Sequence, residues 1–359
     1  MSLTPELIEI AVIPAIKVLV VLGVLSLAVA YLVLLERKVI AFMQVRLGPR
    51  RVGPSGLLQP IADGLKLFLK EDIVPTRADK WVFILAPIVT IIPAFVAFAV
   101  IPFSGQPFQV FGHTVTPWIT DVNIGILYIL SITSLGIFGL IMGGWASNSK
   151  YPLLGALRSA AQMISYEVPL ALSIIGVLML AGTASMVGIV EAQRRAGWWF
   201  FAPQIVGLFV YYVSGVAETN RAPFDLPEAE TELVAGFHTE YSGMKFAFFF
   251  LAEYANMIVV ASIAATLFFG GWLRPFPNVA ALGWLNFLDF IHPVWSGFFW
   301  FSTKVFLVIF VYLWLRATFP RYRYDQLMSL GWKVMLPLSL ANVIITGVVV
   351  LWLGGAPGA

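Results

Sequence analysis

Long apolar stretches constrain this chain more than any other feature of its sequence. A stretch of about twenty apolar residues forms a helix that crosses the ~30 Å hydrocarbon core of a bilayer. By that criterion the sequence predicts about eight transmembrane helices, which lie approximately at residues 8–35, 81–104, 122–145, 160–181, 199–217, 246–270, 297–316 and 333–354. Hydrophobic residues make up 60% of the chain, against about 45–50% in a soluble domain. We therefore expect an all-α polytopic membrane protein.

Two further segments are predicted to lie on the membrane surface. Between residues 57 and 70 the apolar side chains fall on one stripe of a helix, and the charged side chains face away from it. This pattern predicts an interfacial amphipathic helix. A second, smaller one is expected at residues 185–195, beside two tryptophans that suit the depth of a membrane interface.

The predicted loops differ in charge between the two sides of the membrane. Most of the 22 lysine and arginine residues fall in the loops of one side, at residues 36–80, 146–159, 218–245 and 316–333. The positive-inside rule therefore puts these loops in the cytoplasm and both termini on the periplasmic or outer side of a bacterial plasma membrane. We predict one integral membrane domain over residues 1–359, with a cytoplasmic loop at 36–80 that carries the amphipathic helix and a cytoplasmic acidic loop at 218–245.

Several kinds of site are excluded by composition. The chain has no cysteine, so it cannot carry a thiolate-ligated iron–sulfur cluster or a cysteine zinc site. Its three histidines, His113, His238 and His292, lie far apart without metal-ligand spacing. We expect no metal and no catalytic redox centre on this chain, so any redox metal belongs to a partner. The net charge of +3 forms no basic block, which argues against nucleic acid as a partner.

Carboxylates in four predicted spans lie at similar depth. Glu167 and Glu253 are expected in the third turn of their helices from the cytoplasmic end, and Glu36 and Glu218 at the cytoplasmic ends of theirs. Ionisable groups are costly inside lipid, so the default interpretation of such residues is functional. A structural alternative stays open for each. Glu36 and Glu218 can simply end their helices, and the two deeper residues can pair with arginine or lysine from a neighbouring helix.

The outer half of the predicted membrane region holds few titratable groups. Only Lys17 and Lys304 lie there within the spans. A proton path straight across the bilayer needs such groups at every depth. We therefore expect a polar layer that passes protons or ions sideways to a neighbouring subunit.

An acidic loop interrupts this apolar chain. Residues 216–243 are opposed within the segment only by Arg221 and contain Glu218, Asp225, Glu228, Glu230, Glu232 and Glu240. The sequence predicts a short helix here, with Pro227 in its first turn and two carboxylates four positions apart, which repel each other and favour proton uptake. Such a cluster can drive a loop rearrangement through its charge. The alternative is a solvated acidic surface.

Basic residues of the same predicted side form a counterpart to this loop. They are Arg37, Lys38, Arg46, Arg50, Arg51, Arg316, Arg321 and Arg323. Most are expected to act as positive-inside anchors. Others can pair with the acidic loop or face a polar headgroup.

Four segments carry long and specific motifs, ERKVIAFMQVRLGPRRVGPSGLLQPIADGLKLFLKEDIVP, ALRSAAQMISYEVPLAL, AETNRAPFDLPEAETELVAGFHTEYSGMKFAFFFLAEYANMIV and LWLRATFPRYRYDQLMSLGWKVMLPLSL. These motifs resemble the H subunit of bacterial respiratory complex I, whose mitochondrial counterpart is NADH-ubiquinone oxidoreductase chain 1. The resemblance extends from the first predicted span to the last. It is weak at the N-terminus and at residues 105–121, 182–200 and 271–296.

The resemblance implies a membrane subunit of a proton-pumping NADH:quinone oxidoreductase. Quinone would be its substrate, and FMN and iron–sulfur clusters would belong to partner subunits. The implied partners are peripheral-arm subunits with the terminal cluster and the quinone headgroup site, small membrane subunits, antiporter-like membrane subunits and lipid. The quinone tail would enter between residues 8–35, 246–270 and 57–70.

Site residues are carried over position by position from the family motifs. The resemblance implies a quinone chamber or its entrance at Arg37, Arg46, Asp63, Arg316 and Arg321. It implies a lateral proton path at Glu36, Glu167, Glu218, Asp225, Glu228, Glu230, Glu232, Glu240 and Glu253.

Three alternative functions compete with this one. The nearest is the homologous membrane subunit of a proton-translocating hydrogenase or another dehydrogenase, which shares the acidic path. A self-contained proton-coupled carrier predicts broken helices in paired repeats, and the sequence has none. A purely structural anchor disagrees with the two deep glutamates.

Overall fold

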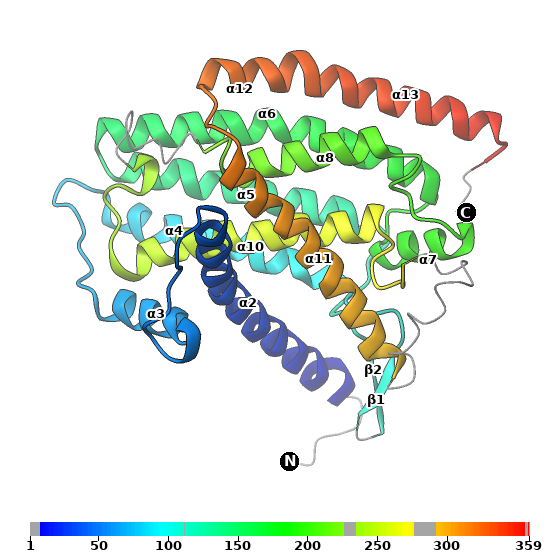
Figure 1. The fold of residues 1–359 in the computed structure, drawn as a ribbon, viewed down its shortest axis with the longest axis horizontal. Coiled ribbons are helices and arrows are strands. Elements are labelled where there is room, and N and C mark those ends of the chain that lie inside the picture. The colour runs from blue at the N-terminus through cyan, green and yellow to red at the C-terminus, as the bar shows by residue number, and fades with distance from the viewer. Residues whose placement is uncertain (1–7, 111, 226–234, 276–291, 356–357, 359) are drawn as a thin grey trace.

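A computed structural model describes residues 8–110, 112–225, 235–275, 292–355 and 358. The described chain is an elongated bundle of helices (Figure 1). Five of them pack on one another at its centre, namely α4 (Lys80–Val96), α5 (Gly125–Ala146), α6 (Lys150–Ala181), α8 (Ile205–Glu218) and α10 (Gly243–Phe268). The all-α polytopic fold that the apolar stretches predict is therefore confirmed.

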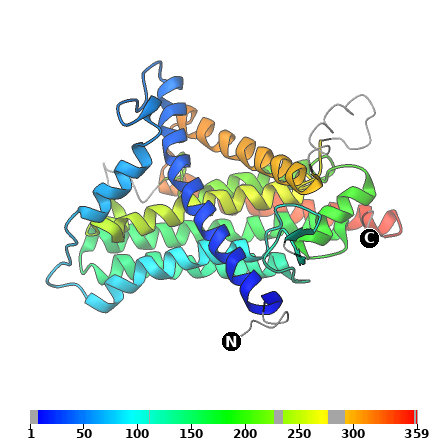
Figure 2. The same cartoon turned by 90° about the horizontal axis from the view of Figure 1, so that it is seen from below.

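Longer helices surround this centre. Helix α13 (Leu336–Trp352) packs on α6, α11 (Pro293–Thr318) packs on α10, and α2 (Ile13–Met43) contacts both α10 and α11. Figure 2 shows α2 crossing the bundle at a steep angle, with its C-terminal end standing away from the other helices. The remaining elements are short, and they are η1 (Ile8–Val12), η2 (Pro54–Gly56), α3 (Gln59–Leu69), η3 (Ala97–Val100), β1 (Phe108–Val110), β2 (His113–Val115), α7 (Met186–Ala196), η4 (Gly236–His238), α12 (Tyr324–Leu330) and η6 (Gly331–Met335).

Seven of the described helices, some counted with the short turns that continue them, are long and apolar enough to cross a bilayer. The predicted span at residues 199–217 is shorter in the structure, because residues 197–204 form turns and α8 has 14 residues. At 1.5 Å per residue such a helix is only about 21 Å long. The predicted start of the fourth span at residue 160 is wrong. Helix α6 begins at Lys150, and Pro152 fits its first turn, where an amide N–H has no helical partner.

The helices at the centre approach closely because glycines face their neighbours. A Cβ atom on Gly139 of α5 would lie 2.1 Å from Thr90 Oγ1 of α4, and one on Gly144 would lie 2.3 Å from Ala156 Cβ of α6. Small residues at such crossings let backbones pack tightly in a membrane protein. Side chains larger than hydrogen are therefore excluded at these two positions.

A buried polar cluster fastens α13 to the bundle. Asn342 Nδ2 donates to Gln204 Oε1 at 2.8 Å, and Gln204 Nε2 donates to Thr346 Oγ1 at 2.7 Å. Gln204 comes directly before α8, so the cluster joins two segments far apart in the sequence. Hydrogen bonds of this kind add to helix association where lipid offers no polar partner.

Both predicted surface helices are present. Helix α3 exposes Ile61, Leu65 and Phe68 on one side, as the amphipathic pattern predicts. Helix α7 starts at Ser185, whose hydroxyl accepts from Gly188 N at 3.1 Å, and ends at Gly197 in the left-handed region. The two helices lie at opposite ends of the molecule (Figure 1).

The two lysines of the predicted outer half hold neighbouring chain segments. Strands β1 and β2 form an antiparallel hairpin that pairs Phe108 with Val115. Lys17 donates to Thr116 Oγ1 at 2.7 Å and to Trp118 O at 3.1 Å, directly after this hairpin. Lys304 is buried and donates to Gly271 O at 2.8 Å and Leu273 O at 2.5 Å, in the turn after α10. Both cations therefore have structural partners.

Candidate functional site

A cavity of about 390 Å³ lies where α2, α10 and α11 meet. Its lining residues come from distant parts of the chain and are Val33, Glu36, Arg37, Ile40, Arg46, Pro49, Arg221, Phe250, Tyr254 and Arg316. Four of the predicted site residues line this one cavity, three of them predicted for the quinone chamber and one for the proton path. The same wall carries arginines and aromatic rings, a combination that suits a flat polar ligand.

Glu36 and Arg316 face each other in this cavity. The Arg316 guanidinium donates a hydrogen bond to Glu36 Oε1. Only 5% of Glu36 is exposed, so its carboxylate depends on this partner for its charge. A residue predicted for the proton path is thus paired directly with one predicted for the quinone chamber.

A second ion pair joins the two predicted groups. Arg321 Nη2 lies 3.3 Å from Asp225 Oδ2, and Asp225 is buried. Next to this pair, Tyr322 N donates to Pro223 O at 3.1 Å, and the Tyr322 ring stacks on Phe224. The chain after α11 is therefore fastened to the start of the acidic loop.

The structure adds Arg221, which the sequence analysis had noted only as the single base among the acids. Arg221 is buried, its Nη2 lies 3.6 Å from Glu253 Oε2, and its guanidinium lies 4.0 Å from the centre of the Tyr254 ring. Glu253 thus has the buried arginine partner that we considered as its structural alternative. The signal that could have found Arg221 was an isolated positive charge inside an acidic segment.

Glu167 and Glu218 lie near each other and interact electrostatically. Ser134 of α5 donates a hydrogen bond to Glu167 Oε1, a contact with no sequence signal because serine is common in membrane helices. The predicted third-turn position of Glu167 is wrong, because α6 begins ten residues earlier and Glu167 lies near its middle. Glu218 is the last residue of α8, as expected.

Asp63 connects α3 to α2. Arg37 Nη1 lies 2.8 Å from Asp63 Oδ2, and Gln59 Nε2 donates to Asp63 Oδ1 at 3.0 Å. The pair is partly exposed, so solvent weakens it relative to the pairs in the cavity. It fixes the amphipathic helix to the rim of the site.

The acidic loop is described only at its two ends. Glu228, Glu230 and Glu232 lie outside the described residues. At the first end, Gln162 Nε2 donates to Ala217 O and Phe224 O, both at 2.7 Å. At the second end Glu240 follows η4, and the neighbouring Tyr241 stacks on Phe83 and donates to Phe83 O at 3.2 Å. Burial raises the pKa of the Tyr241 hydroxyl, which keeps it protonated as a donor.

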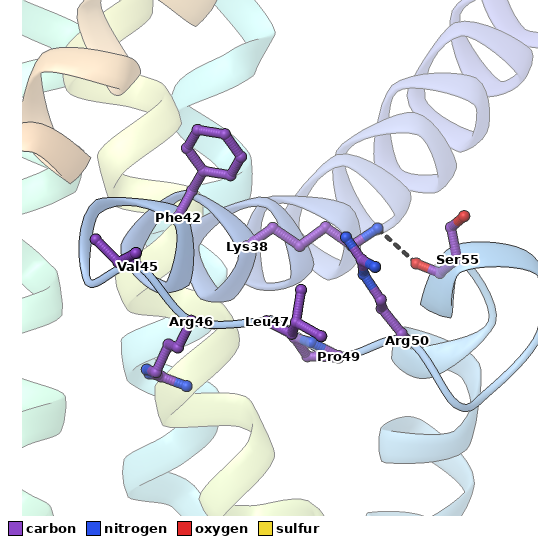
Figure 3. Close-up of a pocket in the computed structure, with 9 residues that line it drawn as sticks. Lys38, Phe42, Val45, Arg46, Leu47, Pro49, Arg50 and Ser55 are labelled. Carbon is purple, nitrogen blue, oxygen red and sulfur yellow. Dashed lines mark hydrogen bonds between the residues drawn. The ribbon is translucent and has the colours of Figure 1, made fainter.

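A second cavity, of about 770 Å³, adjoins the first (Figure 3). Arg46 and Pro49 line both cavities. The second one is built from the end of α2 and the following chain, where Lys38 Nζ donates to Ser55 O at 2.6 Å. Apolar side chains of Phe42, Val45 and Leu47 share its wall with basic ones. Within the described ranges, no group of three or more histidine, aspartate or glutamate residues could hold a metal ion.

Comparison with known proteins agrees with the motifs. The family model described as NADH dehydrogenase matches residues 16–347. The chain belongs to this NADH dehydrogenase family. The resemblance found from the sequence motifs is therefore confirmed.

Curated relatives of this NADH dehydrogenase chain share one name, the H subunit of NADH-quinone oxidoreductase. The H subunit numbered 1 of Geobacter sulfurreducens is 54% identical over 344 residues, which cover 93% of this chain and 94% of the relative. The H subunit of Rickettsia prowazekii is 53% identical and covers 96% and 95%. The H subunit of Rhodospirillum rubrum is 55% identical and covers 89% and 88%.

Proposed function

We propose that this chain, as a membrane subunit of NADH-quinone oxidoreductase, forms the membrane side of the quinone chamber and couples it to a lateral path of carboxylates. The observation that carries the proposal is the ion pair between Arg316 and Glu36 in the 390 Å³ cavity. One partner faces the space for a quinone, and the other is buried at the end of α2. Charge that appears in the cavity must therefore act on a buried carboxylate.

The cavity has the chemistry expected of a quinone site. Arginine side chains donate hydrogen bonds to carbonyl oxygens and stabilise the anions formed when a quinone is reduced. Phe250 and Tyr254 offer ring faces to the headgroup. Helices α2, α3 and α10 contact one another in pairs around the cavity, which supports entry of the tail between them. The lining includes Arg37, Arg46 and Arg316, and we assign Asp63 to the rim through its pair with Arg37.

Coupling follows from competition for the arginines. A negative charge on the reduced quinone attracts Arg316 and weakens its bond to Glu36, whose carboxylate then favours a proton. Arg321 lies close enough to Arg316 for the two like charges to repel, so the disturbance reaches the pair of Arg321 with Asp225. Asp225 begins the acidic loop, and we propose that Glu228, Glu230, Glu232 and Glu240 take part in its rearrangement.

The path then continues through the bundle. Glu218, Glu167 and Glu253 come from α8, α6 and α10, which pack side by side. We propose that protons pass among them toward antiporter-like membrane subunits. The electrons would arrive through FMN and iron–sulfur clusters of peripheral-arm subunits, because this chain has no cysteine to hold a cluster.

The surroundings proposed for the chain follow from the charge distribution of its loops. The basic loops and the acidic loop would face the cytoplasm and the peripheral arm, and both termini would face the outer side of the bacterial inner membrane. Small membrane subunits and lipid would cover the exposed apolar helix faces.

The test uses the whole complex purified in mild detergent and reconstituted into vesicles. Glu36→Gln and Arg316→Gln should reduce inhibitor-sensitive NADH:quinone reduction and proton pumping together, while NADH oxidation by an artificial acceptor at the flavin stays unchanged. Arg51→Gln is the control, since Arg51 is exposed in the same basic segment and lines neither cavity. Unchanged quinone reduction in both variants, or copurification with a hydrogenase in place of an NADH-oxidising subunit, would contradict the proposal.

A further inference from the structure

The last two turns of α8 meet α10 and α11 without a gap. Tyr211 of α8 donates from its hydroxyl to Val260 O at 2.9 Å. One turn later, a Cβ atom on Gly215 would lie 2.5 Å from Val260 Cγ1 and 3.1 Å from the Tyr312 hydroxyl of α11. Gly215 therefore admits the Tyr312 hydroxyl against the α8 backbone, one turn before Glu218.

Three tyrosines lie at this junction, and their hydroxyls differ. The Tyr211 hydroxyl is bonded to Val260 O, and the Tyr212 hydroxyl donates to Val308 O at 3.2 Å. The Tyr312 hydroxyl is buried and has no hydrogen-bond partner of ordinary geometry among the described residues. It does interact electrostatically with Glu218. A buried hydroxyl of this kind requires a partner, because its hydration is lost on folding.

A second hydroxyl with the same property lies on α8 itself. Ser214 is fully buried, and its Oγ likewise lacks a partner within the described part of the chain. Ser214 and Glu218 are four positions apart, so their side chains share one face of the helix. Serines in helix interiors often bond to the carbonyl one turn earlier, and Ser214 does not. Thr219 is already occupied, since its hydroxyl donates to Gly215 O and Val216 O.

We propose that the hydroxyls of Tyr312 and Ser214 hold a water molecule that hydrogen-bonds the Glu218 carboxyl, so that Tyr312 is a positioning residue for Glu218. Neither residue was among the predicted site residues. Buried waters make about three hydrogen bonds to polar groups that the protein leaves unpaired, and two hydroxyls with one carboxyl supply that number. The hydrogen bond itself does not depend on proton pumping, whereas its effect on pumping rests on the proposed function.

Hydroxyl partners suit a carboxyl that changes its protonation state. An ionised carboxylate only accepts hydrogen bonds, and a protonated one also donates. A water held by two hydroxyls can turn to serve either state, because each hydroxyl both donates and accepts. The arrangement keeps Glu218 hydrogen-bonded before and after a proton arrives, with no net change at Tyr312.

The experiment compares Tyr312→Phe with Tyr212→Phe in the complete complex. Tyr212 is a matched control, because its ring packs against Tyr312 and its hydroxyl bonds only to the Val308 carbonyl. The readout is the infrared band of the Glu218 carboxyl or carboxylate, identified by its loss in Glu218→Gln. We expect this band to shift in frequency in Tyr312→Phe and to stay in place in Tyr212→Phe. Proton pumping should fall about five- to tenfold in Tyr312→Phe, the effect of one lost hydrogen bond.

The outcomes separate the two proposals. An unmoved Glu218 band in Tyr312→Phe, or the same shift in both phenylalanine variants, would overturn the inference. A shifted band in Tyr312→Phe together with normal pumping in Glu218→Gln would support the hydrogen bond and refute the role of Glu218 in the proposed path. Density for a water between Tyr312, Ser214 and Glu218 in a high-resolution map of the complex would support the inference directly.

Discussion

Arg316 hydrogen-bonds to Glu36 across 280 positions of the sequence. The pair ties the end of α11 to α2, the helix that crosses the bundle (Figure 2). Removing one partner of a buried pair is costly, because the other charge stays buried without compensation.

We predict that Arg316→Met destabilises the fold by about 2–4 kcal/mol, less than the full loss of a buried pair because Arg316 is partly exposed. Glu36→Gln should cost less, since an amide oxygen can still accept from the arginine. Thermal unfolding of the purified complex, followed by release of this subunit, measures both. The double variant should cost clearly less than the sum of the single ones, and simple additivity would contradict direct coupling.

Arg221 is predicted to be irreplaceable by lysine. The planar guanidinium both approaches Glu253 and lies over the Tyr254 ring, and an ammonium cannot reproduce the two contacts together. Arg221→Lys should lower quinone reductase turnover about tenfold, equivalent to ~1.4 kcal/mol in the activation barrier. Arg51→Lys, on the exposed surface, should change turnover little. Equal rates in the two variants would show that Arg221 acts only through its charge.

Ser134 and Thr133 form a matched pair of neighbours on α5. Ser134 donates to Glu167, whereas Thr133 donates only to the carbonyls of Ile129 and Leu130 in its own helix. Since a hydrogen bond to a charged group contributes about 1.5–3 kcal/mol, Ser134→Ala should impair proton pumping by tenfold or more on that scale. Thr133→Ala should pump nearly normally. Proton uptake by vesicles during NADH oxidation distinguishes the two results.

Gly139 and Gly136 test the tight crossing of α4 and α5. A methyl group on Gly139 meets Thr90 on both its side chain and its backbone, while the same group on Gly136 meets nothing within 4 Å. We predict that Gly139→Ala destabilises the protein by about 1–3 kcal/mol through overpacking, and that Gly136→Ala is neutral or slightly stabilising. Melting temperatures of the two variants in the same detergent are the measurement. A neutral Gly139→Ala would mean that the two helices can move apart freely.

The sequence predicted the elements better than their ends. The apolar stripe of α3 and the long apolar helices were recognisable because each shows in the hydropathy of neighbouring residues. The start of α6 was missed because residues 150–159 mix polar and apolar side chains, and hydropathy detects the part of a helix in lipid, not its extension beyond. The short α8 was overestimated for the opposite reason, since apolar residues 199–204 form turns.

The predicted site residues were found through motifs, but their pairing was not predictable. Nothing local to Glu36 indicates Arg316, because an ion pair between distant helices depends on the packing of the whole bundle. Arg221 could be seen in the sequence as an isolated base, yet its place over the Tyr254 ring required the structure. The assignment of individual residues to the chamber and the path stays a prediction.

Lys17 and Lys304 are held by chain oxygens near β2 and after α10. A membrane voltage does work only on charge that moves along the membrane normal. Lysines fixed in this way do not follow the voltage, and a proton passed sideways between carboxylates, as proposed here, crosses little of it. In electrical terms the subunit then behaves as an insulator, and the work against the voltage is done by neighbours that carry protons from one face to the other.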